Sequence, residues 1–256
     1  METIKTQKHD AFVLSNADEK QCGEMFTRLL KESPVPADEL LPNLGLYLTS
    51  KTLSRVLFFQ HIYQQILNVH GVAMEFGVRW GQTLSLLSAM RGIYEPFNRH
   101  RKLIGFDTFA GFRGFSAEQD GDKCKSADGS FSVTEGYEGY LSDILTIQEK
   151  LNPMSHLQRY ELVKGDATET IPAYFKAHPE AVVSLAILDF DIYKPTKVAL
   201  EHLKDRMPKG SVLVFDELSD EYFPGETVAV QEVFGIRNLR VQRLPITARI
   251  SYAVIE

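Results

Sequence analysis

Short apolar runs alternate with amphipathic stretches along the chain from Gly71 onward. The runs with a strand-like pattern cover residues 72–76, 103–106, 160–163, 182–188, 211–215, 239–244 and 250–255. Stretches with helical spacing follow most of them, at residues 82–91, 134–151, 168–177, 195–206 and 226–234. Continuous apolar strands are typical of a sheet that helices cover on both faces, and the alternation predicts a mainly parallel, doubly wound α/β fold.

The last two strand-like runs are joined by a very short connection, Pro245-Ile246-Thr247. A parallel pair of strands needs a long crossover, whereas an antiparallel pair needs only a turn. We therefore expect a seven-stranded, Rossmann-like sheet with one antiparallel strand. In such sheets, ligands bind at the carboxyl ends of the strands.

The first part of the chain has a different pattern. A helical stretch at residues 16–31 is followed by the proline-rich segment 33–38 and by a long amphipathic helix at residues 50–69. Proline-rich segments of this kind mark linkers. We expect residues 1–50 to form a helical or irregular extension that acts as a lid or an oligomer contact, and residues 51–256 to form the main domain.

Composition and charge are typical of a globular enzyme in the cytoplasm. The chain has 28 basic and 34 acidic residues, a net charge of −6, and its one basic cluster, at residues 99–102, is interpreted as a solvated loop. Nucleic-acid binding needs a concentrated basic face, so this balance argues against it. No apolar run approaches the about 18 residues of a membrane span, and the polar residues 1–10 do not resemble a signal peptide. Two distant cysteines, Cys22 and Cys124, suit a reducing compartment.

A glycine-containing turn follows the first predicted strand. Glu75 lies near the end of the strand, and Gly77 and Gly81 precede the next helix. Glycine lets the backbone turn sharply and approach a ligand closely. The spacing is not that of a dinucleotide site, and Glu75 would repel a pyrophosphate. Its carboxylate instead suits a ligand with an ammonium or sulfonium group, although a purely structural turn is the alternative.

Acidic residues also end the next two predicted strands. Asp107 follows the second strand, where it is placed to accept hydrogen bonds from both hydroxyls of a ribose, with Phe109 packing on a purine. Asp166 follows the third strand. It either accepts a hydrogen bond from an adenine amine or caps the helix that begins near Thr168. These positions predict a nucleoside site beside the glycine turn.

The fourth and fifth strands end in four carboxylates. Asp189 and Asp191 follow the fourth strand, and Asp216 and Glu217 follow the fifth. If the two strands are neighbours, the carboxylates converge and each raises the pKa of the others. A divalent cation removes this conflict, and oxygen ligands suit Mg²⁺, Mn²⁺ or Ca²⁺. Ordinary helix-capping residues are the alternative interpretation.

These motifs together resemble a known family. They are Glu75-Phe76-Gly77-Val78-Arg79-Trp80-Gly81, Phe106-Asp107-Thr108-Phe109-Ala110-Gly111, Leu188-Asp189-Phe190-Asp191-Ile192-Tyr193 and Phe215-Asp216-Glu217. In this order, the chain from about residue 40 onward resembles the macrocin O-methyltransferase family. Its members are class I methyltransferases that use S-adenosylmethionine and Mg²⁺ to modify deoxysugars of natural products. Within the family, the chain looks most like the rhamnose O-methyltransferases of enediyne (calicheamicin-type) assembly.

The resemblance implies a role for each group of residues. Asp189, Asp216 and Glu217 hold the metal, and Asp191 is the general base. The implied contacts are Glu75, Gly77, Gly81, Thr83, Asp107, Thr108, Phe109 and Asp166 to the cofactor, and Tyr193 and Phe131 to the substrate. The family usually has Asp-Gly-Asp and Asp-Asp at the metal site, so the longer Glu217 reaches the metal directly, through a water molecule, or not at all. The Gly165-Asp166 turn also departs from the family, which leaves the adenine contacts open.

The implied reaction is methyl transfer from S-adenosylmethionine to a deoxysugar hydroxyl, on a nucleotide sugar or on a glycosylated product. Asp191 removes the hydroxyl proton beside the metal, and segment 114–139 is expected to form a lid over the acceptor. A homo-oligomer is also implied. Three alternatives stay open: catechol-type O-methylation, a nicotinamide-dependent oxidoreductase, which the missing GxGxxG pattern disfavours, and a non-catalytic binding module, which leaves the carboxylates unexplained.

Overall fold

A seven-stranded sheet forms the centre of the computed structural model, which describes residues 16–123 and 125–256. The strands are β1 (Val72–Phe76), β2 (Leu103–Asp107), β3 (Tyr160–Lys164), β4 (Val183–Leu188), β5 (Val212–Phe215), β6 (Val241–Arg243) and β7 (Ser251–Val254). Each strand begins and ends within two residues of the position expected from the hydrophobic pattern. The pattern therefore located every strand of this sheet.

The strands lie in the order β3-β2-β1-β4-β5-β7-β6. The first five are parallel to their neighbours, whereas β7 is antiparallel to both β5 and β6. This arrangement confirms the predicted doubly wound sheet with one antiparallel strand. The strand order reverses between β1 and β4, so the carboxyl ends of these two strands flank the switch point where ligands bind in open α/β sheets.

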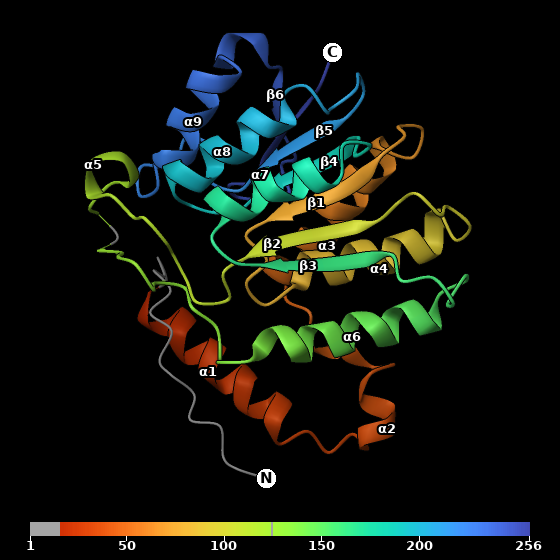
Figure 1. The fold of residues 1–256 in the computed structure, drawn as a ribbon. Helices are drawn as coiled ribbons and strands as arrows, with labels where there is room; N and C mark the ends of the chain where they lie inside the picture. The colour runs from red at the N-terminus through yellow and green to blue at the C-terminus, as the bar shows by residue number, and fades with distance from the viewer. Residues whose placement is uncertain (1–15, 124) are drawn as a thin grey trace.

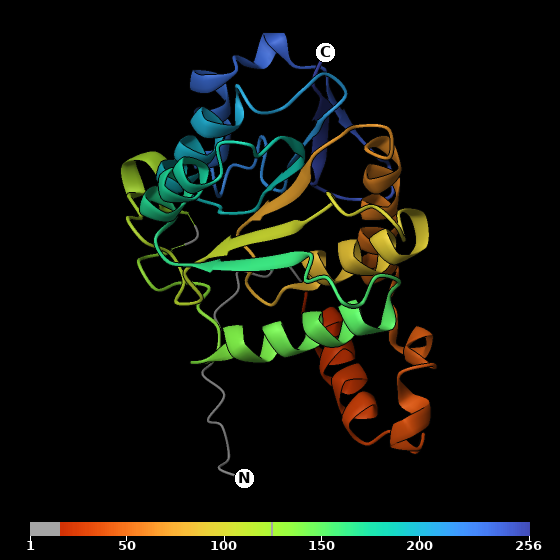
Figure 2. The same ribbon diagram turned by 45° about the vertical axis from the view of Figure 1, so that its right-hand side comes forward.

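Helices cover both faces of the sheet, as Figures 1 and 2 show. One face is covered by α3 (Ser50–Gln65), α4 (Gln82–Tyr94) and α6 (Tyr137–Leu151), and the other by α7 (Ala167–Ala177), α8 (Tyr193–Leu203) and α9 (Gly225–Val233). Successive strand residues point into the two cores, as Ala73 and Met74 of β1 do. The short helices α5 (Ala117–Asp120) and η2 (Ile236–Asn238) lie in connections. None of the helices in the described ranges has the length and apolar character that a membrane crossing requires.

Three buried arginines connect the segments at the amino ends of the strands. Arg91, Arg101 and Arg159 are each at most 1% exposed. Arg101 forms an ion pair with Glu95 and donates to the carbonyls of residues 66, 69 and 71, while Arg91 and Arg159 share Glu149. The interpretation of residues 99–102 as a solvated loop is therefore wrong for Arg101. Its guanidinium satisfies carbonyl groups that the ends of α3 and the start of β1 would otherwise leave without partners.

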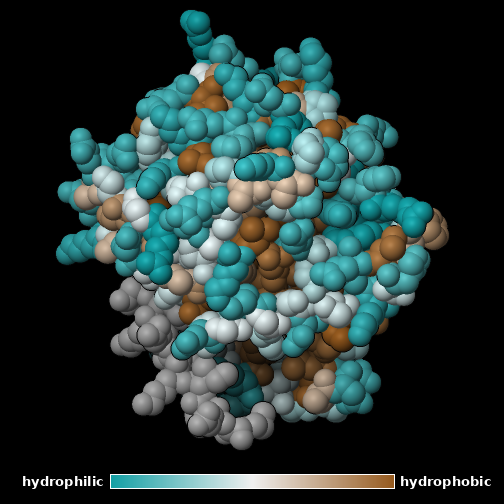
Figure 3. Space-filling model, viewed as in Figure 1, coloured by the Kyte–Doolittle hydropathy of each residue, from teal (hydrophilic) through white to brown (hydrophobic). Residues whose placement is uncertain are grey.

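The N-terminal part of the described chain packs loosely on the rest. The helices α1 (Ala17–Lys31), α2 (Ala37–Leu40) and η1 (Leu44–Tyr47) contain no buried residue. Both α1 and α2 project beyond α6 in the two ribbon views (Figures 1 and 2). Large apolar side chains remain exposed there, namely Met25, Leu29, Leu30, Leu41, Leu44, Leu46 and Leu48. Figure 3 shows brown apolar side chains at this level of the molecule, among polar ones. The division of the chain at residue 50 stays a prediction.

Candidate active site

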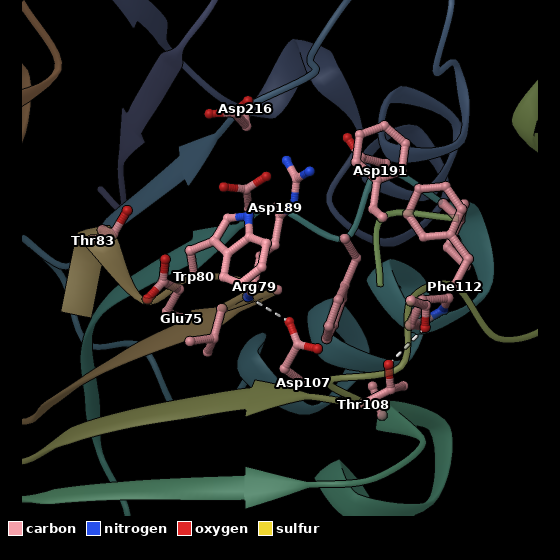
Figure 4. Close-up of a pocket in the computed structure, with 18 of the residues that line it drawn as sticks. Glu75, Arg79, Trp80, Thr83, Asp107, Thr108, Phe112, Asp189, Asp191 and Asp216 are labelled. Atoms are coloured by element: carbon pink, nitrogen blue, oxygen red, sulfur yellow. Dashed lines mark hydrogen bonds between the residues drawn. The ribbon is translucent and has the colours of Figure 1, made fainter. Parts of the chain in front are cut away.

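A cavity of about 330 Å³ opens at the carboxyl ends of the central strands. Its lining includes most of the residues singled out in the sequence, namely Glu75, Gly77, Thr83, Asp107, Thr108, Phe131, Asp166, Asp189, Asp191, Asp216 and Glu217. In Figure 4, Asp189, Asp191 and Asp216 project into one space, with Glu75 and Thr83 to one side and Asp107 and Thr108 below. The fold thus brings segments more than a hundred residues apart to one site.

The glycine turn after β1 is required by close contact with β4. Gly77 has a φ of 102°, and a Cβ atom there would lie 1.9 Å from the backbone oxygen of Asp189. The amide of Asp189 in turn donates to the carbonyl of Phe76. Gly81, with a φ of 72°, precedes α4 and leaves room for Leu141. Both glycines are therefore explained by packing, and Gly77 also lines the cavity.

Glu75 is a buried carboxylate without a cation of its own. Its side chain is 2% exposed, and its Oε2 has no hydrogen-bond partner among the described residues. Burial raises the pKa of Glu75 to about 8, although Arg55 and a hydrogen bond from Thr83 act in the opposite direction. A positively charged group of a ligand would stabilise the ionised form, as expected for an ammonium or sulfonium centre.

Asp107 organises the loops around the nucleoside end of the cavity. One of its oxygens accepts from the amide of Arg79 at 2.7 Å and the other from the amide of Phe109 at 2.6 Å. Burial nevertheless raises its pKa above the usual value. Thr108 closes the same turn, since its hydroxyl donates to the carbonyl of Gly111. Each carboxylate oxygen has more than one lone pair, so the Asp107 side chain keeps acceptor capacity for ribose hydroxyls.

Asp166 caps the helix α7, which was one of its two predicted roles. Its Oδ1 accepts from the amide and the hydroxyl of Thr168, at 2.9 Å and 2.7 Å. The residue also lines the cavity. The capping role is therefore present, and a contact with adenine stays a prediction.

Phe109 and Tyr193, like Gly81, are predicted site residues that do not line the cavity. Phe109 has a φ of 53° and belongs to the core on the face of the sheet that α3, α4 and α6 cover, where it is 5% exposed. The hydroxyl of Tyr193 donates to Glu232 on α9 and accepts from Lys197. Phe109 is thus a core residue and the Tyr193 hydroxyl is paired with Glu232 and Lys197, while the contacts of these two residues with cofactor and substrate stay predictions.

Asp189, Asp191 and Glu217 form a cluster in which one oxygen from each residue lies within 4.8 Å of the others. Burial and the neighbouring carboxylates raise the pKa values of Asp189 and Glu217 well above their usual values. Burial also raises the pKa of Asp191, to about 6. Asp191 has a left-handed φ of 61°, a conformation that Asp tolerates better than most residues.

Two arginines that the sequence analysis missed neutralise part of this charge. Arg55 on α3 lies 3.1 Å from Asp216 and 3.3 Å from Asp189. Arg249, in the connection before β7, lies 2.9 Å from Asp216 and 2.7 Å from Glu217. Burial acts to raise the pKa of Asp216, but Arg55, together with Glu217 and Arg249, holds it below its usual value. Asp216 is therefore the carboxylate of the group that the protein's own cations stabilise best.

The donor set fits a divalent cation. Glu217 is fully buried, yet its Oε2 has no partner among the described residues, and the same is true of Oε2 of the adjacent, fully buried Glu226. Oxygen ligands without nitrogen or sulfur are those that Mg²⁺, Mn²⁺ and Ca²⁺ prefer. Asp189 and Glu217 belong both to the predicted ligand set and to the observed cluster. Asp191, predicted as the base, lies in the cluster, whereas Asp216, predicted as a ligand, is paired with arginines.

Aromatic side chains form the wall next to the acidic cluster. Phe131 and Phe112 line the cavity, and their ring centroids are 5.1 Å apart. The guanidinium of Arg79 lies 5.0 Å from the centroid of Phe131. Phe131 therefore reaches the cavity from segment 114–139, as expected for a residue that contacts the acceptor. The lid function of the segment stays a prediction.

The fold, the glycine turn and the acidic strand ends define a class I methyltransferase architecture, and solved structures show the same. CalS11, described as a calicheamicin methyltransferase, is 37% identical over 99% of both chains, with a TM-score of 0.89. An apo structure of CalS11, described as a TDP-rhamnose 3′-O-methyltransferase, is 36% identical over 97% of this chain and 99% of that one, with a TM-score of 0.83. The O-methyltransferase NovP shares the fold at 16% identity over 79% of both chains, with a TM-score of 0.61.

Comparisons with protein-family profiles and with curated protein sequences found no match. The full-length similarity to CalS11 is sufficient on its own to establish the family of this chain. The chain belongs to this family of S-adenosylmethionine-dependent O-methyltransferases, the family that the four motifs indicated. The predicted enzyme class is therefore confirmed.

Proposed function

We propose that this enzyme methylates a hydroxyl of a deoxysugar, on a nucleotide sugar or a glycosylated natural product, with the help of a divalent cation. The observation that carries the proposal is the Asp189, Asp191 and Glu217 cluster in the same cavity as the glycine turn. The description of CalS11 as a TDP-rhamnose 3′-O-methyltransferase supports the sugar as acceptor.

The cofactor end of the cavity is formed by β1 and β2. In the proposal, Glu75 faces the positively charged part of S-adenosylmethionine, and Gly77 lets the cofactor approach the backbone. Asp107 accepts hydrogen bonds from the ribose hydroxyls, while Asp166 lies where it can contact the adenine. These roles orient the methyl group toward the acidic cluster, and orientation alone is worth several kcal/mol of the barrier to methyl transfer, on the order of 10⁵-fold or more in favourable systems.

The cation is assigned to Asp189 and Glu217, the residues shared by the sequence prediction and the observed cluster. When bound, such an ion lowers the pKa of a hydroxyl that it contacts. Asp216 stays paired with Arg249 in this assignment, and it joins the ligands only if it gives up Arg55. The charges of the two arginines do not balance the buried carboxylates, which leaves room for a cation.

Asp191 is proposed as the general base that accepts the hydroxyl proton. Its pKa of about 6 leaves the carboxylate mostly ionised at neutral pH while keeping it a stronger base than an ordinary aspartate. General bases work best when their pKa lies near the operating pH. Asp191 has a left-handed backbone and lines the cavity directly before α8.

The acceptor side suits a ring-bearing, anionic molecule. Arg79 stacks on Phe131 and forms no ion pair with any described residue, in contrast to Arg55 and Arg249. Guanidinium groups bind phosphate well, and aromatic rings pack against sugar and base rings. These features support a nucleotide sugar over a neutral catechol.

The test is a comparison of acceptors with purified enzyme and S-adenosylmethionine. TDP-rhamnose, other nucleotide deoxysugars, rhamnosides and simple catechols are incubated with Mg²⁺ or with EDTA, and the methylated product is detected by mass spectrometry. We expect a rhamnose-containing acceptor to be methylated in the presence of Mg²⁺, and EDTA to abolish this methylation. Methylation of catechols alone, or equal rates with EDTA, would contradict it.

The N-terminal extension is proposed to act as a lid or as a contact in a homo-oligomer. Its helices bury no residue of their own and expose the apolar side chains named above. Apolar patches of this kind are characteristic of interaction surfaces. Light scattering on the intact chain and on a chain that starts at residue 50 tests this role, because a monomer in both cases, with equal activity, would exclude it.

A further inference from the structure

We propose that Arg55 binds the α-carboxylate of the methionine part of S-adenosylmethionine, while Glu75 binds the neighbouring α-ammonium group. The inference uses the cofactor class of the family and assigns a role to a residue outside the four sequence motifs. It makes the helix α3, at the border with the N-terminal extension, part of the cofactor site.

Arg55 reaches the cofactor end of the cavity. Its guanidinium Nη2 donates to the hydroxyl of Thr83 at 3.1 Å, at the start of α4 directly after the glycine turn. The side chain lines the cavity and is 25% exposed. The ring of Phe59, whose centroid lies 5.1 Å from Cζ, supports the guanidinium from the same helix. Arg55 therefore presents its charge beside the turn that the cofactor approaches.

Glu75 supplies the second, independent observation. Its side chain is 98% buried, lines the same cavity, and has an oxygen without a partner among the described residues. Arg55 is near enough to affect the pKa of Glu75, yet the two side chains form no ion pair. An amino-acid group carries its ammonium and its carboxylate on one carbon atom, so its charges complement a carboxylate and a guanidinium that flank it.

The guanidinium has donors available for a carboxylate. Its Nε is buried and has no hydrogen-bond partner among the described residues. Its contact with Asp189 is long for a charge-assisted hydrogen bond, at 3.3 Å, and Asp216 keeps Arg249 as a partner if Arg55 turns away. Arginine binds carboxylates through two parallel hydrogen bonds. Exchange of the Asp189 contact for the cofactor carboxylate therefore leaves neither Asp189 nor Asp216 without a cation, provided that the metal site takes over Asp189.

If Arg55 binds the α-carboxylate, the cofactor site distinguishes ligands that carry this carboxylate from ligands that lack it. A charge-assisted, paired hydrogen bond of this type changes affinity by about ten- to a hundred-fold. The enzyme should therefore bind S-adenosylhomocysteine more tightly than its decarboxylated analogue, which keeps the adenosine, the sulfur and the amine but lacks the carboxylate.

Calorimetric titration of the full chain with these two ligands, in the presence of Mg²⁺, tests the role of Arg55. The wild-type enzyme should prefer S-adenosylhomocysteine by at least about ten-fold. Arg55→Gln should lose that preference because it binds S-adenosylhomocysteine more weakly, while its affinity for the decarboxylated analogue stays within about two-fold. Arg55→Lys, which keeps the charge but not the paired geometry, should retain part of the preference.

Arg249→Gln is the matched control. It removes the guanidinium from the other carboxylate oxygen of Asp216 and leaves the contact of Arg55 with Thr83 in place, so it should keep the wild-type preference. An Arg55→Gln enzyme that keeps the preference, or that loses affinity for both ligands equally, would overturn the proposal. If the wild-type enzyme bound neither ligand, the cofactor class itself would fail, which is a different result from a failure at Arg55.

Discussion

The two ends of the same sheet bury charge in opposite ways. At the amino ends of the strands, Arg91, Arg101 and Arg159 are buried, and the two carboxylates there, Glu95 and Glu149, each have an arginine partner. Most of the other arginine donors bind backbone carbonyls, whereas Nε of Arg91 and Nε of Arg159 have no hydrogen-bond partner among the described residues. This end has more arginines than carboxylates, and the backbone carbonyls accept most of the additional donors, so every buried carboxylate named here has a cation.

At the carboxyl ends, the surplus is of carboxylates. Asp189, Asp216 and Glu217 share two arginines, whereas Glu75, Asp191 and Glu226 form no ion pair with any described residue. Buried carboxylates without partners are costly, since desolvation destabilises their charged form. Both ends therefore bury charge, but only the carboxyl end has carboxylates without a cationic partner among the described residues, and the proposed cofactor and cation sites lie at that end.

The largest effect is expected from Asp191→Asn. The amide is similar in size but cannot accept the proton, so turnover should fall by about 10²- to 10⁴-fold, the usual contribution of a general base. Calorimetry should find the affinity for S-adenosylhomocysteine within about two-fold of wild type, because Asp191 belongs to the acceptor side. Asp220→Asn is the control, since the Asp220 side chain binds Arg249 and the amide of Tyr222 but does not line the cavity. Near-normal turnover of the Asp191 variant would remove it from the role of base.

At the opposite end, Glu149→Gln should reduce stability rather than activity. It leaves Arg91 and Arg159 buried without their carboxylate, which is expected to lower the free energy of unfolding by about 3–5 kcal/mol. Urea unfolding measures the loss, and KM values at low temperature should stay near those of wild type. Glu226→Gln is the counterpart at the carboxyl end and should leave stability unchanged or increase it, because it removes an unpaired buried charge. Equal losses in both variants would contradict the comparison.

A smaller effect concerns Glu75 and pH. Its pKa of about 8 is above that of an unfolded chain, so its contribution to the stability of the free enzyme decreases as the pH rises from about 4.5 to about 8. Binding of the cofactor ammonium requires the ionised form. The affinity for S-adenosylhomocysteine should therefore increase by up to about ten-fold per pH unit between about pH 6 and 8.

Glu75→Gln provides the check on this pH dependence. The variant should bind S-adenosylhomocysteine weakly and with little change over the same pH range. Calorimetry in two buffers of different ionisation enthalpy should also detect proton release when the wild-type enzyme binds the ligand near pH 7. An unchanged pH profile in the variant would show that another group titrates.

The smallest effect is expected from Tyr193→Phe. The Tyr193 hydroxyl binds Glu232 and Lys197 on the helical surface, so its removal should change kcat/KM by less than about three-fold and stability by about 1 kcal/mol. Phe131→Ala, by contrast, removes a ring that lines the cavity and should raise the KM for the acceptor. A large loss of turnover in the Tyr193 variant would instead support the predicted contact with substrate.

The sequence was sufficient to predict the features that depend on the local pattern of apolar and polar residues. Apolar runs located the strands, and polar residues at their ends located the cavity, because parallel strands deliver their carboxyl ends to one edge. It was insufficient where the backbone turns unexpectedly. The left-handed φ at Phe109 directs the ring into the core, although its neighbours Asp107 and Thr108 line the cavity.

Long-range pairing was the other limit. Arg55 and Arg249 lie 134 and 32 residues from the carboxylates Asp189 and Glu217 that they bind, and no motif connects them. A surplus of acids at the strand ends implies compensating cations, but not which ones. Likewise, nothing local distinguishes the buried Arg101 from its exposed neighbours in the cluster at residues 99–102.

The account is tested most directly by counting bound Mn²⁺ with electron paramagnetic resonance, in the wild-type enzyme and in Glu217→Gln. We predict one tightly bound Mn²⁺ per wild-type chain and an affinity at least about ten-fold weaker in the variant, because one of its few charged oxygen ligands is lost. The absence of a stoichiometric site in the wild-type enzyme, or equal affinity in the variant, would contradict the claim that the unbalanced carboxylates bind a cation.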